Sequence, residues 1–293
     1  MKQISKMKIV ITGSSGFIGR TLQKHLKKEN IILLSRKFYK RNVNKKFCKI
    51  IYNNKKKIIP KIECDVLIHA AAITPQKYYT FSEYKKINFL GLKTLIKNIK
   101  INKKLIFLST TDIYKNIYTK KVAKEKNKVN FKELSDYAKS KFLCEVYLKN
   151  LDKKKYNFKK IILRLPGIVG KNNHKNFISN IVNQVINKEK INFYNGEKLF
   201  NNIYHVDCLC DFINSILKKN FIKNYNIINI ATNKPIKVKN IFKLITKRKK
   251  TFEINSNKKD YSFIIDVSKF NKYYKKKTTT KILNKYFRIN RLN

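Results

Sequence analysis

Apolar residues follow two periods along the first half of the chain. Short apolar runs, which suit buried strands, alternate with segments in which apolar residues recur every three or four positions, as on one face of a helix. This alternation predicts a parallel sheet whose strands are joined by crossover helices. Strands are expected at residues 8–12, 31–35, 49–52, 66–69, 105–109 and 160–164, with helices at 16–28, 82–101 and 133–150. The pattern does not settle whether the short, Lys-rich link at 53–64 holds a helix.

The pattern loosens after Pro166. It predicts helices at 176–187, 207–218 and 238–246, and strand-like segments at 191–194, 200–205 and 225–230. Short elements of both kinds, without regular alternation, indicate a smaller mixed region that returns one or two elements to the main sheet.

The net charge of +52 over 293 residues raises the question of nucleic-acid binding. Only seven of the 69 basic residues are Arg, so 62 are Lys, and they are spread over the whole chain with no separate basic tail. A hydrophobic content of 43% argues for an ordinary folded core beneath this charge. We therefore interpret the lysines as a solvated coat of the kind an A/T-biased genome produces. No specific nucleic-acid partner is predicted, although acidic small molecules would be attracted.

The five cysteines form no CxxC pair, and no His, Cys or Asp cluster has metal-ligand spacing. No apolar run approaches the length of a membrane span, and the run at 9–11 is too short for a secretory signal. These features predict a reduced, cytoplasmic protein that binds no metal.

Three of the chain's seven glycines fall within the segment GSSGFIG, at Gly13, Gly16 and Gly19. The segment lies between a predicted strand and a predicted helix. Glycine there permits a tight turn, a close approach of backbone to a pyrophosphate, and close packing of helix on strand. The helix N-terminus then offers free N–H groups and a partial positive charge to the phosphates. The segment predicts dinucleotide binding.

The second strand ends at Ser35-Arg36-Lys37, where the adenosine ribose should lie. An acidic residue at this place favours NAD, whereas a guanidinium suits a 2′-phosphate. Arg36 therefore predicts a preference for NADP(H), with NAD(H) as the alternative.

Hydroxyl groups end the strand that runs into LSTTDIY, at Ser109, Thr110 and Thr111. Such groups at the carboxyl end of a parallel strand face the ligand crevice. The following helix carries Tyr137 and Lys141 at positions i and i+4, so both lie on one face. A neighbouring ammonium stabilises a phenolate and makes tyrosine usable as an acid and base near neutral pH. The Tyr-x-x-x-Lys spacing also arises by chance in a chain so rich in Lys. Its place at the start of the helix that follows the hydroxyl-ended strand is what supports a catalytic role.

The motifs together resemble one family over nearly the whole chain, the extended short-chain dehydrogenase/reductases, which include NAD(P)-dependent epimerases, dehydratases and reductases of sugar nucleotides. They are ITGSSGFIG, DVLIHAAA, INFLGLKTL, LSTTDIY, YAKSK, ILRLPGIVG, IYHVDC and IIDVSKF, in this order. The resemblance implies an α/β fold with a Rossmann-type doubly wound parallel sheet and a smaller mixed α/β C-terminal substrate-binding region.

The resemblance also implies a role for particular residues. Tyr137 would be the acid/base, Lys141 would hold the nicotinamide ribose and depress the pKa of Tyr137, and Thr110 would hydrogen-bond the reacting oxygen. Asn88 would support the site, and Asn53 stands where many members have Asp facing the adenine. The cofactor-binding set is expected to be Gly13, Ser15, Gly16, Phe17, Ile18, Gly19, Arg36, Asn53, Ala70, Ala71, Asn88, Tyr137, Lys141 and Pro166.

The domain organisation follows from the same resemblance. Residues 1–170 would form the NAD(P)-binding domain, with 203–232 returning to it, while 171–202 and 233–293 would form the substrate-binding cap. The helices at 82–101 and 133–150 would pair with those of a second subunit in a homodimer.

Departures from the family patterns narrow the activity. Dehydratases of this family carry Thr-Asp-Glu before the strand-end Tyr, whereas this chain has Thr110-Thr111-Asp112. Many nucleotide-sugar epimerases have Arg-Asp where this chain has Asn201-Asn202. Together with Arg36, these differences predict an NADPH-dependent keto-sugar reductase. A nucleotide-sugar 4-epimerase with tightly bound NAD is the first alternative, and a non-catalytic NAD(P)-binding assembly or sensor protein is the second.

Overall fold

The computed structural model describes residues 6–26, 29–35, 47–49, 51–52, 57–58, 61–114, 122–189, 192–245, 253–255 and 264–290. The chain forms two compact units. The first comprises Met1–Thr110, Ser135–Leu163 and Cys210–Ile227, and the second comprises Thr111–Leu134, Arg164–Leu209 and Ile228–Asn293.

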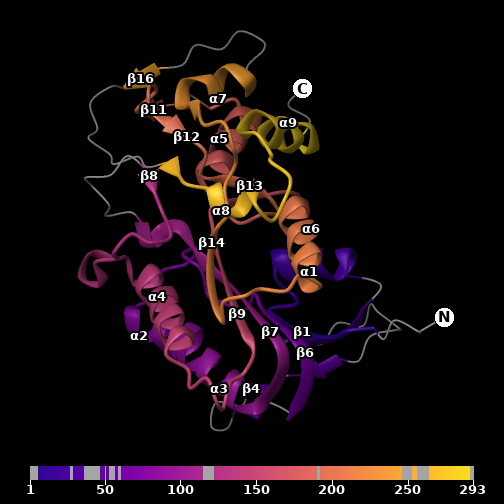
Figure 1. Ribbon diagram of the computed structural model, residues 1–293. Coiled ribbons are helices and arrows are strands. Elements are labelled where there is room, and N and C mark those ends of the chain that lie inside the picture. The colour runs from indigo at the N-terminus through magenta and orange to yellow at the C-terminus, as the bar shows by residue number, and fades with distance from the viewer. Residues whose placement is uncertain are drawn as a thin grey trace, which may run out of the picture. The chain divides into compact units, whose positions relative to one another are not determined.

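A seven-stranded sheet organises the first unit, in the order β14-β9-β7-β6-β1-β2-β3 (Figure 1). Its strands are β1 (Lys8–Thr12), β2 (Asn30–Ser35), β3 (Phe47–Lys49), β6 (Ile62–His69), β7 (Ile99–Thr110), β9 (Lys159–Leu165) and β14 (Tyr225–Asn229). The pairs β3–β2, β2–β1, β1–β6 and β6–β7 are parallel. The order reverses between β1 and β6, so the sheet has its topological switch point there, where doubly wound folds bind ligands.

Helices cover both faces of this sheet (Figure 1). On one side lie α2 (Phe81–Tyr84), the π-helix η1 (Lys85–Leu90), α3 (Gly91–Asn98) and α4 (Asp136–Lys149). Their apolar residues, among them Leu92 and Leu148, form one buried cluster with strand residues such as Val10 and Phe107. On the other side lie α1 (Phe17–His25) and α6 (Val206–Leu217), joined by His25 Nδ1 and Asp211 Oδ1 at 2.7 Å. Strands β1, β2 and β9 are buried on both faces, which explains their unbroken apolar runs.

The second unit is built from short elements. It contains two-stranded pairings that are parallel (β10–β13, β11–β16, β17–β8) or antiparallel (β12–β15). The elements are η2 (Thr111–Tyr114), β8 (Val122–Ala123), η3 (Phe131–Glu133), β10 (Gly167–Val169), α5 (Phe177–Ile186), β11 (Asn192–Tyr194), β12 (Leu199–Phe200), β13 (Ile203–His205), β15 (Ile236–Lys237), α7 (Val238–Ile245), β16 (Glu253–Asn255), β17 (Ile264–Ile265), α8 (Ser268–Asn271) and α9 (Thr279–Ile289).

The predicted fold class is confirmed, and two predicted elements are wrong. The helix expected at 82–101 ends at Asn98, and β7 begins at Ile99 because Ile99 pairs with Ile62 of β6. The single strand expected at 49–52 divides into β3, which joins the sheet, and β4 (Ile51–Tyr52), which pairs antiparallel with β5 (Lys57–Ile58).

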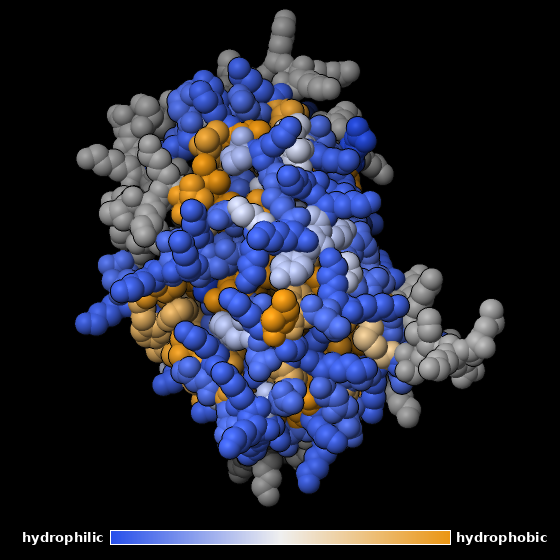
Figure 2. Space-filling model, in the orientation of Figure 1, coloured by the Kyte–Doolittle hydropathy of each residue, from blue (hydrophilic) through white to orange (hydrophobic). Residues whose placement is uncertain are grey.

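The surface in Figure 2 is mostly hydrophilic, with apolar residues in small groups. This agrees with lysines that coat an ordinary core instead of forming one separate basic segment. Within the described parts of the chain, no helix is both long enough and apolar enough to cross a membrane.

Candidate functional site

The glycine-rich turn connects β1 to α1 at the switch point of the sheet. Gly13 has φ +65°, and a Cβ on it would lie 2.6 Å from the backbone N of Ala71. A Cβ on Gly19 would lie 2.8 Å from Cα of Ser14. Gly16 differs, because its φ of −77° suits any residue and a Cβ there would meet only the Gly13 carbonyl, at 3.2 Å. Two of the glycines are therefore required by the turn itself, whereas Gly16 keeps the exposed side of the turn free of a side chain.

The N-terminus of α1 fits a pyrophosphate. Gly16 is its N-cap and supplies no side-chain hydrogen bond, and the first turn contains no acidic residue. The first N–H groups of a helix have no partner within the helix, and together with the macrodipole they attract an anion. The turn leaves room for backbone to approach the phosphates, so Gly13, Ser15, Gly16, Phe17, Ile18 and Gly19 suit the dinucleotide predicted from the sequence.

Ala70 and Ala71 follow β6 and lie against the glycine turn. A Cβ placed on Gly13 would lie 2.7 Å from the carbonyl carbon of Ala70 and 2.6 Å from the backbone N of Ala71. The Ala71 N–H donates to Thr12 Oγ1 at 3.3 Å, and the same oxygen lies 2.8 Å from His69 Nδ1. These bonds tie the ends of β1 and β6 together at the place where the cofactor is expected. The predicted cofactor residues at 13–19 and 70–71 thus share one edge of the sheet.

Helix α4 presents Tyr137 and Lys141 one turn apart. It begins at Asp136, after Ser135 caps it by accepting from the Ala138 N–H at 3.3 Å. Tyr137 is half-buried, and its ring lies 5.8 Å from that of Tyr84. Lys141 is buried, and this burial lowers its pKa to about 8, although Cys144 and Glu145 act in the opposite direction. An ammonium held in a buried place beside the half-exposed phenol is the pairing that the acid/base role requires.

Thr110 is the last residue of β7 and is buried. Three residues before it, Phe107 lies beneath Lys141, whose Nζ lies 4.2 Å from the ring centroid. Ser109, next to Thr110, donates to Glu145 Oε1 at 2.5 Å. Strand β7 and helix α4 are therefore joined by two contacts, just before Thr110 on the strand and after Tyr137 on the helix.

Asn88 is buried in the π-helix and uses its whole amide within the protein. Its Oδ1 accepts from the Ile73 N–H at 2.9 Å, and its Nδ2 donates to Ile73 O at 3.1 Å and to Ser140 Oγ at 3.0 Å. Ser140 in turn donates to Tyr137 O at 2.7 Å. Asn88 thus joins the segment after β6 to helix α4, which suits the supporting role that the sequence predicted for it.

Sequence reasoning overlooked Phe107 and Glu145. Both could have been found from periodicity. Phe107 lies two residues before Ser109, so both share a face of β7, and Glu145 lies four residues after Lys141, so both share a face of α4. A glutamate one helical turn after Lys141, on the same face of α4, was the available signal.

The other predicted residues divide into two groups. Pro166 is buried between β9 and β10, and it belongs to the second unit. Arg36 and Asn53 lie outside the described residues, so the geometry behind the expected NADP(H) preference is not described.

Two positions that depart from the family patterns are hydrogen-bonded to each other in the second unit. Thr111 is buried, and its Oγ1 lies 3.0 Å from Asn202 Oδ1 and 3.2 Å from Leu165 O. Asn201 is also buried, and its amide bonds Thr232 O and Ile265 O, each at 2.9 Å. The side chains of Thr111 and Asn201 therefore stabilise the packing of this unit. Asn201 does not replace a diphosphate-binding arginine.

His69 is buried at the end of β6, and its ring stacks on Phe107 with centroids 5.7 Å apart. Burial, with a smaller contribution from Lys141, lowers the pKa of His69 to about 3. The histidine is therefore neutral at physiological pH and acts in packing.

We expect His69→Phe to make stability less sensitive to acid. Because the folded pKa lies far below the ordinary value of 6.5, this group's contribution is intact above pH 6.5 and is lost as pH falls towards 3. Between pH 7 and pH 4.5 the wild type should lose about 2 to 3 kcal/mol more than the variant. Urea unfolding at both pH values measures this difference. His174→Phe, at an exposed position, is the matched control, and equal losses in His69→Phe and wild type would contradict the prediction.

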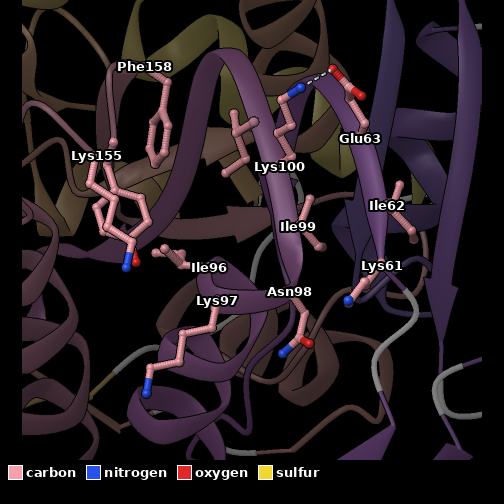
Figure 3. Close-up of a pocket in the computed structure, with 12 residues that line it drawn as sticks. Lys61, Ile62, Glu63, Ile96, Lys97, Asn98, Ile99, Lys100, Lys155 and Phe158 are labelled. Atoms are coloured by element: carbon pink, nitrogen blue, oxygen red, sulfur yellow. Dashed lines mark ion pairs between the residues drawn. The ribbon is translucent and has the colours of Figure 1, made fainter.

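A cavity of about 590 Å³ lies at the amino ends of β6 and β7, away from the glycine turn (Figure 3). Buried isoleucines such as Ile62 and Ile99 line it, and Lys100 reaches across to Glu63 at 3.0 Å. None of the predicted catalytic or cofactor residues lines this cavity. It is therefore separate from the candidate site.

Across the described ranges, no group of three or more His, Cys, Asp and Glu side chains is placed to hold a metal ion. Cys64, Cys144, Cys208 and Cys210 are buried and reduced.

The sheet, the glycine turn at its switch point and the Tyr137–Lys141 helix together form a Rossmann-type fold suited to a nicotinamide dinucleotide. The model of the NAD dependent epimerase/dehydratase family matches residues 9–231, and the chain belongs to this family. A curated relative, dTDP-D-glucose 4,6-dehydratase of Dictyostelium discoideum, is 28% identical over 252 residues, which cover 75% of this chain and 58% of that protein. The chain thus spans little more than half the length of this relative.

Solved structures with the same fold include two epimerases. UDP-N-acetylglucosamine 4-epimerase from Methanobrevibacter ruminantium, in complex with UDP-N-acetylmuramic acid, has a TM-score of 0.76 and 20% identity, covering 98% of each chain. UDP-glucuronic acid 4-epimerase from Bacillus cereus, in complex with NAD, has a TM-score of 0.73 and 21% identity, covering 97% of each chain. At this identity the likeness shows the fold alone.

Proposed function

We propose that this protein is a nucleotide-sugar 4-epimerase that keeps NAD tightly bound. The comparisons favour this reading over the keto-sugar reductase that Arg36 predicted, because similar solved structures are described as 4-epimerases and one is a complex with NAD. The curated relative is a dehydratase, so the residues themselves must separate dehydration from epimerisation.

The hydrogen bonding of Thr111 carries this choice. Dehydration needs an acid to protonate the departing hydroxyl, and the resemblance places that acid at position 111. A threonine hydroxyl does not ionise near neutral pH, and this one is buried against Leu165 O and Asn202 Oδ1. The chain therefore keeps the residues for moving hydride and proton but lacks the group that expels water.

In the proposed reaction, NAD held at the glycine turn would supply a hydride acceptor and then a hydride donor, so the sugar would undergo no net oxidation. Tyr137 would take the proton of the C4 hydroxyl as the C–H bond at C4 of the sugar breaks. It would return the proton when the C4 ketone is reduced on the opposite face of the carbonyl. Thr110 would hydrogen-bond the reacting oxygen, and Lys141 would hold the cofactor ribose and favour the phenolate of Tyr137. Gly13, Gly16 and Gly19 would admit the pyrophosphate.

Product analysis without added cofactor tests the proposal. The purified protein, incubated with UDP-glucose, UDP-N-acetylglucosamine, UDP-glucuronic acid or dTDP-glucose, should convert at least one to its 4-epimer, as NMR of the sugar region would show. NADPH should not be consumed when 4-keto sugar nucleotides are offered. Stoichiometric NADPH consumption would identify the reductase instead, and a 4-keto-6-deoxy product would identify a dehydratase.

We extend the proposal to cofactor choice, oligomeric state and location. NAD is proposed over NADP. Titration of wild type and Arg36→Ala with NADH and NADPH tests this choice, because a large NADPH preference that Arg36→Ala abolishes would contradict it.

A homodimer through α2–α4 is supported by exposed Leu90 and Val146, with exposed fractions of 41% and 38%. A sedimentation mass equal to one chain would contradict the dimer. Four buried, reduced cysteines suit a reducing cytoplasm.

A further inference from the structure

Phe107 contacts both Lys141 and His69 inside the first unit. Lys141 Nζ lies 4.2 Å from the Phe107 centroid, and the His69 ring stacks on Phe107 at 5.7 Å with an interplanar angle of 11°. The exposed fraction is 0% for Phe107 and 3% for both Lys141 and His69. The ammonium therefore lies on an aromatic ring in a place from which water is excluded.

An aromatic ring face carries partial negative charge and attracts a cation, and the attraction grows when the cation is desolvated. The contact at Phe107 is short compared with Lys160 over Phe158, at 5.1 Å. The π-face is thus a principal source of attraction for the charge that Lys141 brings into the interior. Replacing the ring with an aliphatic side chain would keep the burial and remove this attraction.

The spacing of β7 and α4 gives Phe107 a second effect. Two strand residues span about 6.7 Å, and four helical residues span about 6.0 Å. The distance from Phe107 to Ser109 along β7 is therefore close to the distance from Lys141 to Glu145 along α4. This similarity allows Lys141 to contact Phe107 and Glu145 to accept a hydrogen bond from Ser109 at the same time. Phe107 therefore determines the position of the ammonium along the strand, three residues before β7 ends at Thr110.

We propose that Phe107 is a positioning residue that holds the charged Lys141 against the end of β7, ready to meet the cofactor ribose. The inference rests on the role proposed for Lys141. His69 supports the ring from β6, and Thr12 fixes His69 in turn, with Oγ1 to Nδ1 at 2.8 Å. The titratable groups that act on Lys141 are Cys144 and Glu145 on its own helix, and Lys141 itself acts on His69 of β6.

The test compares Phe107→Leu and Phe107→Met with wild type by NADH binding as a function of pH. Weaker attraction should raise the NADH dissociation constant about three- to tenfold. Because the ring stabilises the charged amine, its loss should also move the alkaline decline in NADH affinity to lower pH, by about half to one pH unit. Phe107→Tyr keeps the ring and should restore wild-type values. Two aliphatic replacements guard against one that fails to fold.

Phe158→Leu is the matched control, because it removes a ring from beneath another buried lysine, Lys160, at the amino end of β9 and so away from the glycine turn. It should lose stability like the Phe107 variants but keep the wild-type NADH affinity and pH profile. Wild-type binding in both Phe107 variants would overturn the proposal, and so would weaker binding with an unchanged pH profile, which would mean packing alone.

Lys141→Met separates this inference from the proposed function. If Lys141→Met binds NADH as wild type does, the role assigned to Lys141 fails and both proposals fall. If Lys141→Met loses affinity while Phe107→Leu and Phe107→Met do not, only the positioning role of Phe107 is overturned.

Discussion

Tyr137→Phe should lower turnover about a thousandfold while the protein still folds and still binds NAD. The substitution removes one hydroxyl from a half-buried ring on α4, and proton transfer by a positioned side chain contributes about 10²- to 10⁴-fold to rate. The cofactor contacts expected at the glycine turn and Lys141 are untouched. The measurements are the rate of sugar-nucleotide conversion and the NADH dissociation constant.

Tyr84→Phe is the matched control for this prediction. Its ring packs against that of Tyr137 at 5.8 Å, and the substitution removes the same hydroxyl from a neighbouring tyrosine. It should retain activity within about twofold, as a substitution outside the proton path does. Comparable losses in both variants would show that packing around the rings, not the Tyr137 hydroxyl, limits the rate.

Gly13→Ala should abolish cofactor binding and destabilise the fold by about 3 kcal/mol or more. A methyl group there would force φ +65° on a residue with a side chain and would lie 2.6 Å from Ala71 N. Gly91→Ala is the control, because nothing lies within 4 Å of its Cβ. Alanine is favoured over glycine inside a helix by about 1 kcal/mol, so this variant should be at least as stable as wild type.

Gly16→Ala distinguishes the loss of cofactor from the loss of fold. Its φ of −77° accepts alanine, and its Cβ meets only Gly13 O at 3.2 Å, so the melting temperature should change little. The methyl group would nevertheless occupy the exposed side of the turn, where the pyrophosphate is expected, and should weaken NADH binding about tenfold or more. Unchanged NADH affinity in Gly16→Ala would place the phosphates elsewhere.

The parts of the fold that local pattern controls were predictable. Strand β1 and helix α1 carry strong apolar periodicity, and the turn residue Gly13 and the α4 cap residue Ser135 lie beside their helices in sequence. The start of β7 was not predictable in this way. The segment IKIN alternates with a strand period but continues the helical spacing of Ile96, and pairing of Ile99 with Ile62 decides between the two.

The candidate site shows the same division. Tyr137, Lys141 and the glycines came from motifs in which neighbouring residues act together. The bond between Thr111 and Asn202 joins residues 91 positions apart, and the clamp from Asn88 to Ser140 spans 52. Such contacts depend on the assembled fold, so spacing alone did not show that Asn201 and Asn202 are committed to packing.

One measurement tests the central claim most directly. A nucleotide sugar deuterated at C4 is incubated with the purified protein without added cofactor, and the product is analysed by NMR and mass spectrometry. If the hydride leaves the sugar and returns to it, the 4-epimer should keep its deuterium at C4, and none should pass to solvent. A 4-epimer with hydrogen at C4, or a product that forms only when NADPH is supplied and consumed, would contradict the account.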